Sequence, residues 1–205
     1  MRTKKRVVSK KEILYGISIL ALLLGICVGA IFANYMNYIQ NQELINYMNN
    51  FFMGFPDRNI SYLDILKQSI LSHGRTIALL WVFGLGVVGI PLAFLVVFAK
   101  GFSYGFTSSF LLIHYGFDGF IFSLTSFLPQ SIILIPGIIF VSAASMNFAV
   151  ANYKSNQKYF KERRGKWMDY GLVLLIGILI IILTGFIETF ISPLFMKMIM
   201  NNMIN

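Results

Sequence analysis

The chain is poor in charge and in cysteine. Only 12% of its 205 residues are Asp, Glu, Lys or Arg, and eight of these are acidic, whereas soluble domains carry about 25% charged residues. Hydrophobic residues reach 57%, which is more than a globule of this size can bury behind so few charges. The composition therefore excludes a soluble domain and requires a lipid environment. The single cysteine, Cys27, excludes an intramolecular disulfide and hence a disulfide-stapled secreted domain.

Catalytic and metal-binding motifs are also missing. The sequence has no HExxH, CxxC, GxSxG or Walker-type phosphate loop, and its two histidines, His73 and His114, lie in different segments without ligand-spaced neighbours. Serines are plentiful, but a nucleophile also needs a base within reach. We therefore expect no catalytic residue, no metal site and no cofactor. An intramembrane hydrolase that uses Glu188 and His114 is the enzymatic alternative.

Long apolar runs take the place of these motifs. A membrane-spanning helix needs about 20 apolar residues, and such runs occupy residues 13–32, 76–99 and 170–191. Residues 102–150 are too long for one crossing, and the sequence GFDG at 116–119 predicts a turn between helices over 102–117 and 120–150. We predict an all-α polytopic membrane protein, a single membrane domain with a bundle of about five transmembrane helices.

Basic residues cluster between these runs. Thirteen of the 17 are expected on one side, in the cytoplasm: Arg2, Lys4, Lys5, Arg6, Lys10, Lys11, Lys100, Lys154, Lys158, Lys161, Arg163, Arg164 and Lys166. The positive-inside rule then predicts cytoplasmic segments at 1–12 and 151–169, and extracytoplasmic segments at 33–75 and 192–205. The first run is too long for a signal peptide and lacks a cleavage site, so it is interpreted as a retained anchor. The basic residues indicate topology, and no nucleic-acid partner is expected.

Small residues recur at helical spacing in the first two runs. Ala21, Gly25, Gly29 and Ala33 share one face of the first helix, and spacing of this kind lets a second helix approach closely. Gly86 and Gly89 repeat the pattern more weakly in the second run. Two interpretations follow: packing among the protein's own helices, or a docking face for the membrane helix of a partner.

Polar residues and prolines mark the later helices. Pro129 and Pro136 predict that the fourth helix is broken or kinked at Pro129-Gln130, and the Gln130 amide needs a hydrogen-bond partner in hydrocarbon. Such a break marks either a transport site or a structural kink. Glu188 is an intramembrane carboxylate, so it is either a functional group or a buried hydrogen-bonded one, and His114 is a candidate partner of similar depth.

The extracytoplasmic loop has an amphipathic pattern. Leu44, Met48, Phe51, Phe52 and Phe55 form an apolar stripe at helical spacing, which predicts a helix on the membrane surface or against a partner. Pro56-Asp57 predicts a turn, and the sequence SYLD at 61–64 predicts the start of another helix that runs through residue 70.

Five segments together resemble the stage II sporulation protein M family of endospore-forming bacteria. They are LWVFGLGVVGIPL at 80–92, KGFSYGF at 100–106, YGFDGFIF at 115–122, FLPQSIILIP at 127–136 and FIETFISP at 186–193. Their order and spacing, over more than a hundred residues, are more specific than any one segment. The family-like positions are Pro91, Lys100, Gly101, Pro129, Gln130, Pro136, Glu188, Ser192 and Pro193.

The resemblance implies a role in engulfment, in which the mother-cell membrane migrates around the forespore. It implies a scaffold in the bacterial cell membrane, at the sporulation septum, that recruits the peptidoglycan-remodelling stage II sporulation proteins P and D. It assigns no catalytic role to any residue. A small transporter or channel that uses Gln130 and Glu188 is the alternative function.

Overall fold

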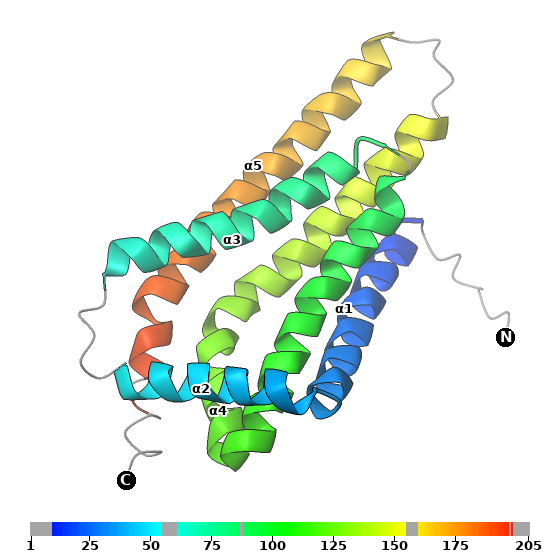
Figure 1. The fold of residues 1–205 in the computed structure, drawn as a ribbon. Coiled ribbons are helices and arrows are strands. Elements are labelled where there is room, and N and C mark those ends of the chain that lie inside the picture. Colours follow the sequence, from blue (N-terminus) through cyan, green and yellow to red (C-terminus); the bar gives the residue numbers. More distant parts are fainter. Residues whose placement is uncertain (1–9, 55–60, 87, 155–159, 197, 199–205) are drawn as a thin grey trace, which may run out of the picture.

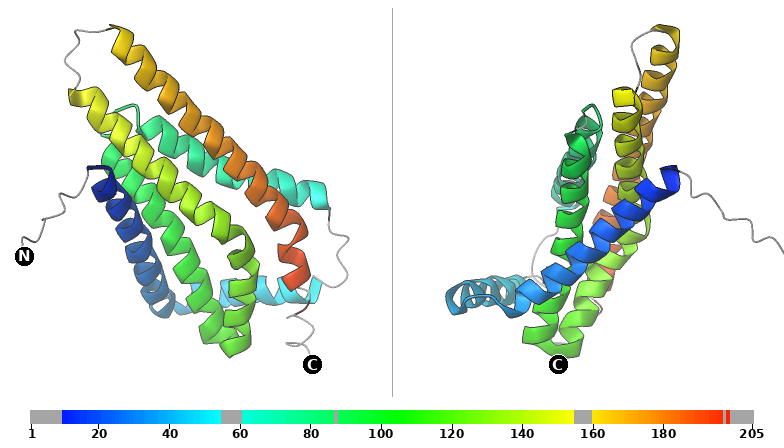
Figure 2. Two further views of the ribbon diagram at one scale, coloured as in Figure 1. Left: turned by 180° about the vertical axis from the view of Figure 1, so that it is seen from behind. Right: turned by 90° about the vertical axis from the view of Figure 1, so that its right-hand side faces the viewer.

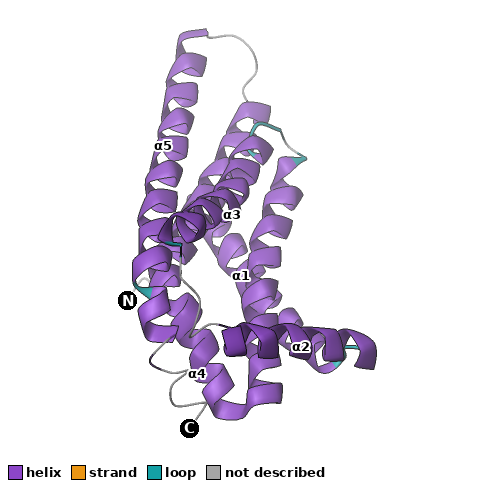
Figure 3. Ribbon diagram, turned by 60° about the vertical axis from the view of Figure 1, so that its left-hand side comes forward, coloured by secondary structure: helices purple, strands orange, loops and turns teal. Residues whose placement is uncertain are grey.

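The computed structural model describes residues 10–54, 61–86, 88–154, 160–196 and 198. They form five helices: α1 (Lys10–Asn34), α2 (Tyr38–Gly54), α3 (Tyr62–Phe83), α4 (Gly89–Lys154) and α5 (Phe160–Phe190). Figure 3 shows only helices and loops over these residues, so the predicted all-α class is confirmed. The basic segment before residue 10, the Pro56-Asp57 turn and the tail after residue 198 lie outside the described residues.

Three stretches are long and apolar enough to cross a membrane: Lys10–Asn34, Gly89–Asn152 and Trp167–Met196. The second has 64 residues, and it folds back on itself at Gly116, whose φ is +65°. Glycine adopts this left-handed conformation without steric cost, so the predicted turn in the GFDG segment is confirmed. The turn divides α4 into two arms, residues 89–115 and 117–154, that lie side by side (Figure 1). The chain is thus an integral membrane protein with several long apolar helices.

The helix predicted over residues 76–99 is interrupted. α3 ends at Phe83, where the Gly84 amide donates to the carbonyls of Leu80 and Trp81 at 3.3 and 3.2 Å, and α4 begins at Gly89. The turn was not expected because its residues, 84–88, are glycine or aliphatic and leave the hydropathy high. The first arm of α4 therefore joins the end of the predicted second helix to the predicted third, and Lys100 lies within a helix instead of a cytoplasmic loop.

α3 also begins earlier than its hydropathy indicates. It starts at Tyr62 with Ser61 as the N-cap residue, as the SYLD sequence predicts, although the Ser61 side chain makes no capping hydrogen bond. It continues past residue 70 to Phe83. Residues 62–75, which we expected in the extracytoplasmic loop, are therefore the first half of a bundle helix.

The small face of α1 packs against the first arm of α4. A Cβ on Gly25 would overlap the backbone of Phe98 and would lie 2.8 Å from a backbone nitrogen of α4. A Cβ on Gly29 would overlap the backbone of Phe102 and would lie 2.9 Å from the next such nitrogen. In the reverse direction, Cβ atoms on Gly101 and Gly105 would overlap the backbone of α1. Two glycine pairs, each spaced by four residues, thus bring the helix backbones into contact, as the adjacent blue and green helices of Figure 1 illustrate.

The remaining small residues divide into two groups. Ala21 and Ala33 are buried on the same face of α1 as the glycines, so that face is occupied within the chain. Gly86 instead lies in the turn between α3 and α4, and Gly89 is the first residue of α4. Nothing lies within 4 Å of a Cβ on Gly86, and a Cβ on Gly89 would overlap the carbonyl of Phe83 at the end of α3.

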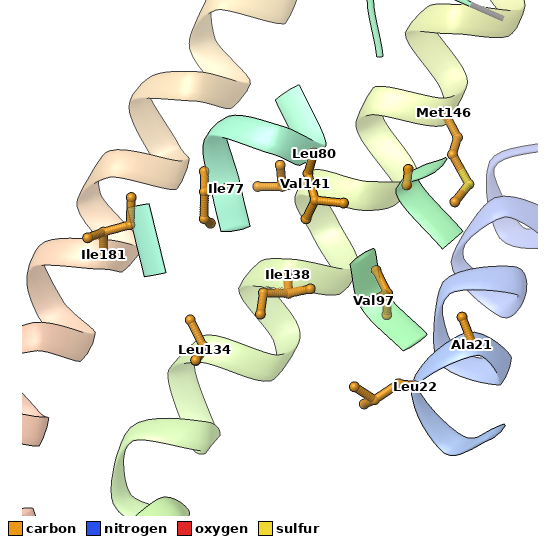
Figure 4. Packing of buried hydrophobic residues seen from close by; sticks show 11 residues of the cluster. Ala21, Leu22, Ile77, Leu80, Val97, Leu134, Ile138, Val141, Met146 and Ile181 are labelled. Atoms are coloured by element: carbon orange, nitrogen blue, oxygen red, sulfur yellow. The ribbon is translucent and has the colours of Figure 1, made fainter. Parts of the chain in front are cut away.

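The main core lies where α1, α3, α5 and both arms of α4 meet. Figure 4 shows aliphatic side chains from these helices converging. The buried members are Ala21, Leu22, Ile77, Leu80, Ala93, Val97, Leu134, Ile138, Val141, Met146 and Ile181. The outward sides of α1 and α5 remain apolar and exposed, as expected for helices that face lipid.

α2 lies crosswise at one end of the bundle, against the α4 turn (Figure 2). The Tyr115 hydroxyl donates to Asn49 Oδ1 at 2.8 Å, and the Phe52 ring meets those of Tyr115 and Phe122 edge-on at 5.1 Å. The predicted stripe of Leu44, Met48, Phe51 and Phe52 packs on this cluster, while Phe55 lies outside the described residues. The helix is confirmed, but its apolar side is covered by the chain itself.

Candidate functional site

α3 and α5 lie antiparallel and carry most of the candidate site. Tyr62 stacks on Phe190 at 5.7 Å, and at the opposite ends Trp81 stacks on Tyr170 at 5.3 Å. Between these contacts, Ser69 and His73 are one helical turn apart on the buried face of α3 and point toward Glu188 of α5. The antiparallel packing of the two helices thus brings Ser69 and His73 to Glu188.

The Glu188 carboxylate is held by two side chains of α3. The Ser69 hydroxyl donates to Oε2 at 2.5 Å, and His73 Nε2 lies 2.9 Å from the same oxygen. Ser69 and His73 are 2% and 6% exposed, and His73 Nδ1 is buried without a hydrogen-bond partner. The Glu188 side chain retains 30% exposure. The pair thus joins a buried imidazole to a carboxylate that reaches the edge of the bundle.

Lys100 and Tyr104 of α4 complete the surroundings of the carboxylate. Both are half-buried, and both lie near enough to Glu188 to feel the charge of its carboxylate. A charged lysine within a membrane helix needs a compensating charge nearby. The cluster Ser69, His73, Lys100, Tyr104 and Glu188, which we call the α3–α5 polar cluster, therefore combines one acid with two basic side chains.

A hollow of about 520 Å³ opens beside this cluster, between α3 and α5. It is lined by Asp64, Ile65, Gln68, Ser69, Ser72 and Glu188. Its lining has two carboxylates, one amide and two hydroxyls, but no basic side chain. The carboxylate, amide carbonyl and hydroxyl oxygens all accept hydrogen bonds, so the hollow suits a cationic group.

The expected partner of Glu188 was His114, and the structure replaces it with His73. His114 lies against the Phe110 ring, at 4.6 Å, in the cluster beneath α2. The sequence does not single out His73, because the low hydropathy of residues 33–75 predicts a loop outside the membrane. The spacing of Ser69, His73, Ile77 and Leu80 was the signal, since these residues share the buried face of one amphipathic helix.

Gln130 lies elsewhere in the interior. It is 5% exposed, and its Oε1 is buried without a hydrogen-bond partner, so the expected bond to a neighbouring helix is not formed by this oxygen. Pro129 and Pro136 both lie inside α4, and Gly116 is where α4 leaves helical φ/ψ. The second arm curves through this stretch without a break (Figure 1), and the predicted irregularity is therefore a bend.

The other family-like positions have structural surroundings. Pro91 lies in the first turn of α4, where its missing amide hydrogen breaks no helical bond. Ser192 and Pro193 are buried just after α5, and Gly101 belongs to the interface with α1. Among the described residues, no three His, Cys, Asp or Glu side chains are grouped so that they could hold a metal ion.

Comparison with known proteins identifies the family. No curated protein and no solved structure matches the chain. The family model for stage II sporulation protein M matches residues 18–193, which include most of α1, the whole of α2 to α5, the polar cluster and the glycine interface. The chain therefore belongs to the stage II sporulation protein M family, a family of sporulation membrane proteins.

Proposed function

We propose that the protein is a membrane scaffold for engulfment, which recruits peptidoglycan-remodelling enzymes to the septal membrane of the sporulating cell. The observation that carries the proposal is the family match over nearly the whole chain. By that membership, its partners are the stage II sporulation proteins P and D, and its own chain performs no catalysis.

The packing of the bundle supports a scaffold. Glycine contacts fix α1 to α4, and hydrogen bonds and ring stacking fix α3 to α5. α2 is tied to the α4 turn, and the exposed side chains at this end of the bundle include Tyr38, Tyr47 and Met53 of α2 and Phe117 of the turn. We call these four residues the outer platform. Aromatic and methionine side chains are enriched in protein interfaces, so the outer platform is suited to contact an enzyme that works on the wall.

The proposed topology places the N-terminus in the cytoplasm and the C-terminus outside. The start of α1 lies toward the same end of the molecule as the end of α4 and the start of α5, and α2 lies at the other end with the α4 turn (Figure 1). The two basic segments of the sequence adjoin that first end. The positive-inside rule then puts the outer platform on the wall side.

Co-purification from sporulating cells tests the scaffold. We expect the tagged, intact protein to recover a peptidoglycan hydrolase from solubilised membranes. A photo-crosslinking residue in place of Tyr47, which is 68% exposed, should capture that enzyme, and the same residue in place of Ile19 on the lipid side of α1 should not. Recovery of no hydrolase by well-expressed protein would refute the proposal.

A small transporter is the second candidate, and the polar cluster is what favours it. Lys100 and Glu188 bring ionisable groups into the bundle, and transport sites are often built from such intramembrane groups. Liposomes that contain the protein should then conduct ions or protons, and Glu188→Gln should abolish the flux. If the liposomes stay tight under gradients of H⁺, Na⁺ and K⁺, the transport function is excluded for these ions.

A further inference from the structure

The outward face of α3 differs from the outward faces of the other long helices. α1 and α5 expose aliphatic and aromatic side chains along their lengths. α3 instead exposes a series of polar residues on one side, which we call the α3 polar face: Asp64, Lys67, Gln68, Ser72 and Arg75. α3 is also absent from the helices apolar enough to cross a membrane on their own. This face is poorly suited to lipid.

The α3 polar face lies alongside a stretch of α5 that is long and apolar enough to cross a membrane. Ser69 is beside Glu188, and a Cβ on Gly177 of α5 would lie 2.6 Å from the Ile77 side chain. Residues 64–75 of α3 therefore lie beside α5, from about residue 188 toward residue 177. This part of α5 belongs to the apolar stretch Trp167–Met196. Charged groups at such depth are costly unless another group pairs with them.

The hollow beside this face contains the two charged side chains that can least easily reach the headgroups. Lys67 and Arg75 have long, flexible side chains that can carry their charge toward the headgroups, whereas Asp64 and Glu188 are short. Both hydrogen bonds that hold Glu188 go to Oε2. The basic side chains near its carboxylate, His73 and Lys100, belong to the polar cluster and do not line the hollow.

We propose that this hollow is a docking site for a lysine or arginine side chain on the membrane-spanning helix of a partner protein. The inference rests on the proposed scaffold function and gives it a surface within the bilayer. The hollow, about 520 Å³, takes the end of a long side chain. Leu63, Leu71 and Leu79 are exposed on the outward side of α3 and offer apolar contact to the rest of the partner helix.

A second copy of the chain fits the hollow less well. In a twofold pair about an axis along the membrane normal, equivalent residues lie at equal depth, so Arg75 would approach Arg75 across an α3–α3 contact. The exposed sides of α1 and α5 are apolar where they cross the bilayer and present no cation to the hollow. Charge complementarity therefore favours a different protein.

Model membrane peptides test the proposal on the full-length protein. The probe is a Leu/Ala helix of about 24 residues with one lysine in its extracytoplasmic half, and matched peptides carry Arg, Leu or Glu there. The protein carries Cys27→Ser and a fluorophore on Leu85→Cys, in the turn after α3 and outside the docking surface. It is placed in phosphatidylcholine liposomes, and energy transfer reports binding. We expect the Lys and Arg peptides to bind about tenfold more tightly than the Leu and Glu peptides.

Matched variants identify the site. Asp64→Asn with Glu188→Gln should reduce binding of the Lys peptide to the level of the Leu peptide. Asp64→Asn alone leaves the contacts of Glu188 to α3 intact and should weaken binding about threefold. Glu43→Gln on α2 and Asp118→Asn at the α4 turn remove exposed acids elsewhere and should have no effect. Equal binding of all peptides, or full binding to Asp64→Asn/Glu188→Gln, would overturn the proposal.

Two further outcomes separate this inference from its alternatives. If phosphatidylethanolamine in the liposomes abolishes the advantage of the Lys peptide, the hollow belongs to a lipid amine and the partner-helix proposal is overturned. In sporulating cells, a hydrolase recovered equally well by wild type and by Asp64→Asn/Glu188→Gln refutes the hollow while the scaffold stands. Selective binding of the Lys peptide without any recovered hydrolase supports the hollow and refutes the scaffold.

Discussion

Trp81 and Tyr170 hydrogen-bond to each other's backbone. The Trp81 Nε1 donates to the carbonyl of Tyr170 at 3.2 Å, the Tyr170 hydroxyl donates to the carbonyl of Trp81, and the two rings stack at 5.3 Å. The same hydroxyl lies 3.2 Å from Ser145 Oγ on α4. These contacts close the turn after α3, and the bonds from Ser69 and His73 to Glu188 fasten the other half of the helix. α3, the least apolar helix of the bundle core, is therefore held at two separate points.

Tyr170→Phe should weaken the first of these points without disturbing the ring stack. The variant loses the hydroxyl and leaves the Trp81 carbonyl without that donor, which should lower the free energy of unfolding by about 1–2 kcal/mol. Unfolding by SDS in mixed micelles measures the change. Tyr47→Phe, on the exposed side of α2, is the control and should unfold like the wild type.

His73→Phe should weaken the second point. Phenylalanine keeps the ring volume but leaves Glu188 without the imidazole, and we expect a loss of about 1–3 kcal/mol. The double variant His73→Phe/Glu188→Gln should lose less unfolding free energy than the two single variants together, because both substitutions remove the same interaction. The same cycle with His114→Phe should be additive, and coupling of His114 to Glu188 would contradict the assigned pair.

Much of this architecture follows from local sequence. The GFDG turn was predictable because only glycine adopts the φ that Gly116 needs, and the close approach of α1 was predictable from small residues every fourth position. α3 was not, because Asp64, Lys67 and Arg75 lower its hydropathy and face outward. The turn at 84–88 was hidden for the opposite reason, since it is apolar and depends on space that only Gly84 leaves beside Ser145.

The candidate site was predictable only in part. Glu188 stands out as an acid in an apolar segment, but its partners depend on which helix lies beside α5. Once α3 is placed, His73 and Ser69 are obvious, because they occupy the buried face four residues apart. The position of Lys100 depends on tertiary structure in the same way. Hydropathy predicts that Lys100 follows the end of a helix, whereas in a helix that begins at Gly89 it lies in the interior.

Gly25→Leu and Gly29→Leu should each separate α1 from α4. The atoms that a new side chain meets first are backbone atoms of Phe98 and Phe102, which cannot move aside as a flexible side chain can. We expect a loss of at least about 2 kcal/mol and faster proteolysis of the α1–α2 connection. Gly16→Leu is the matched control, since nothing lies within 4 Å of its Cβ, and a similar loss there would indicate a general effect on insertion.

Cysteine labelling distinguishes the observed helix boundaries from those that hydropathy suggests. In a Cys27→Ser background, a membrane-impermeant maleimide should label Phe117→Cys, at the α4 turn, in intact spheroplasts. Leu85→Cys, in the turn between α3 and α4, should react only after the membrane is opened, because that turn lies at the opposite end of the first arm of α4. Lys100→Cys should react slowly under both conditions, since residue 100 lies within the bundle. Rapid labelling of Lys100→Cys after opening would instead restore a cytoplasmic loop at that position and contradict a helix that begins at Gly89.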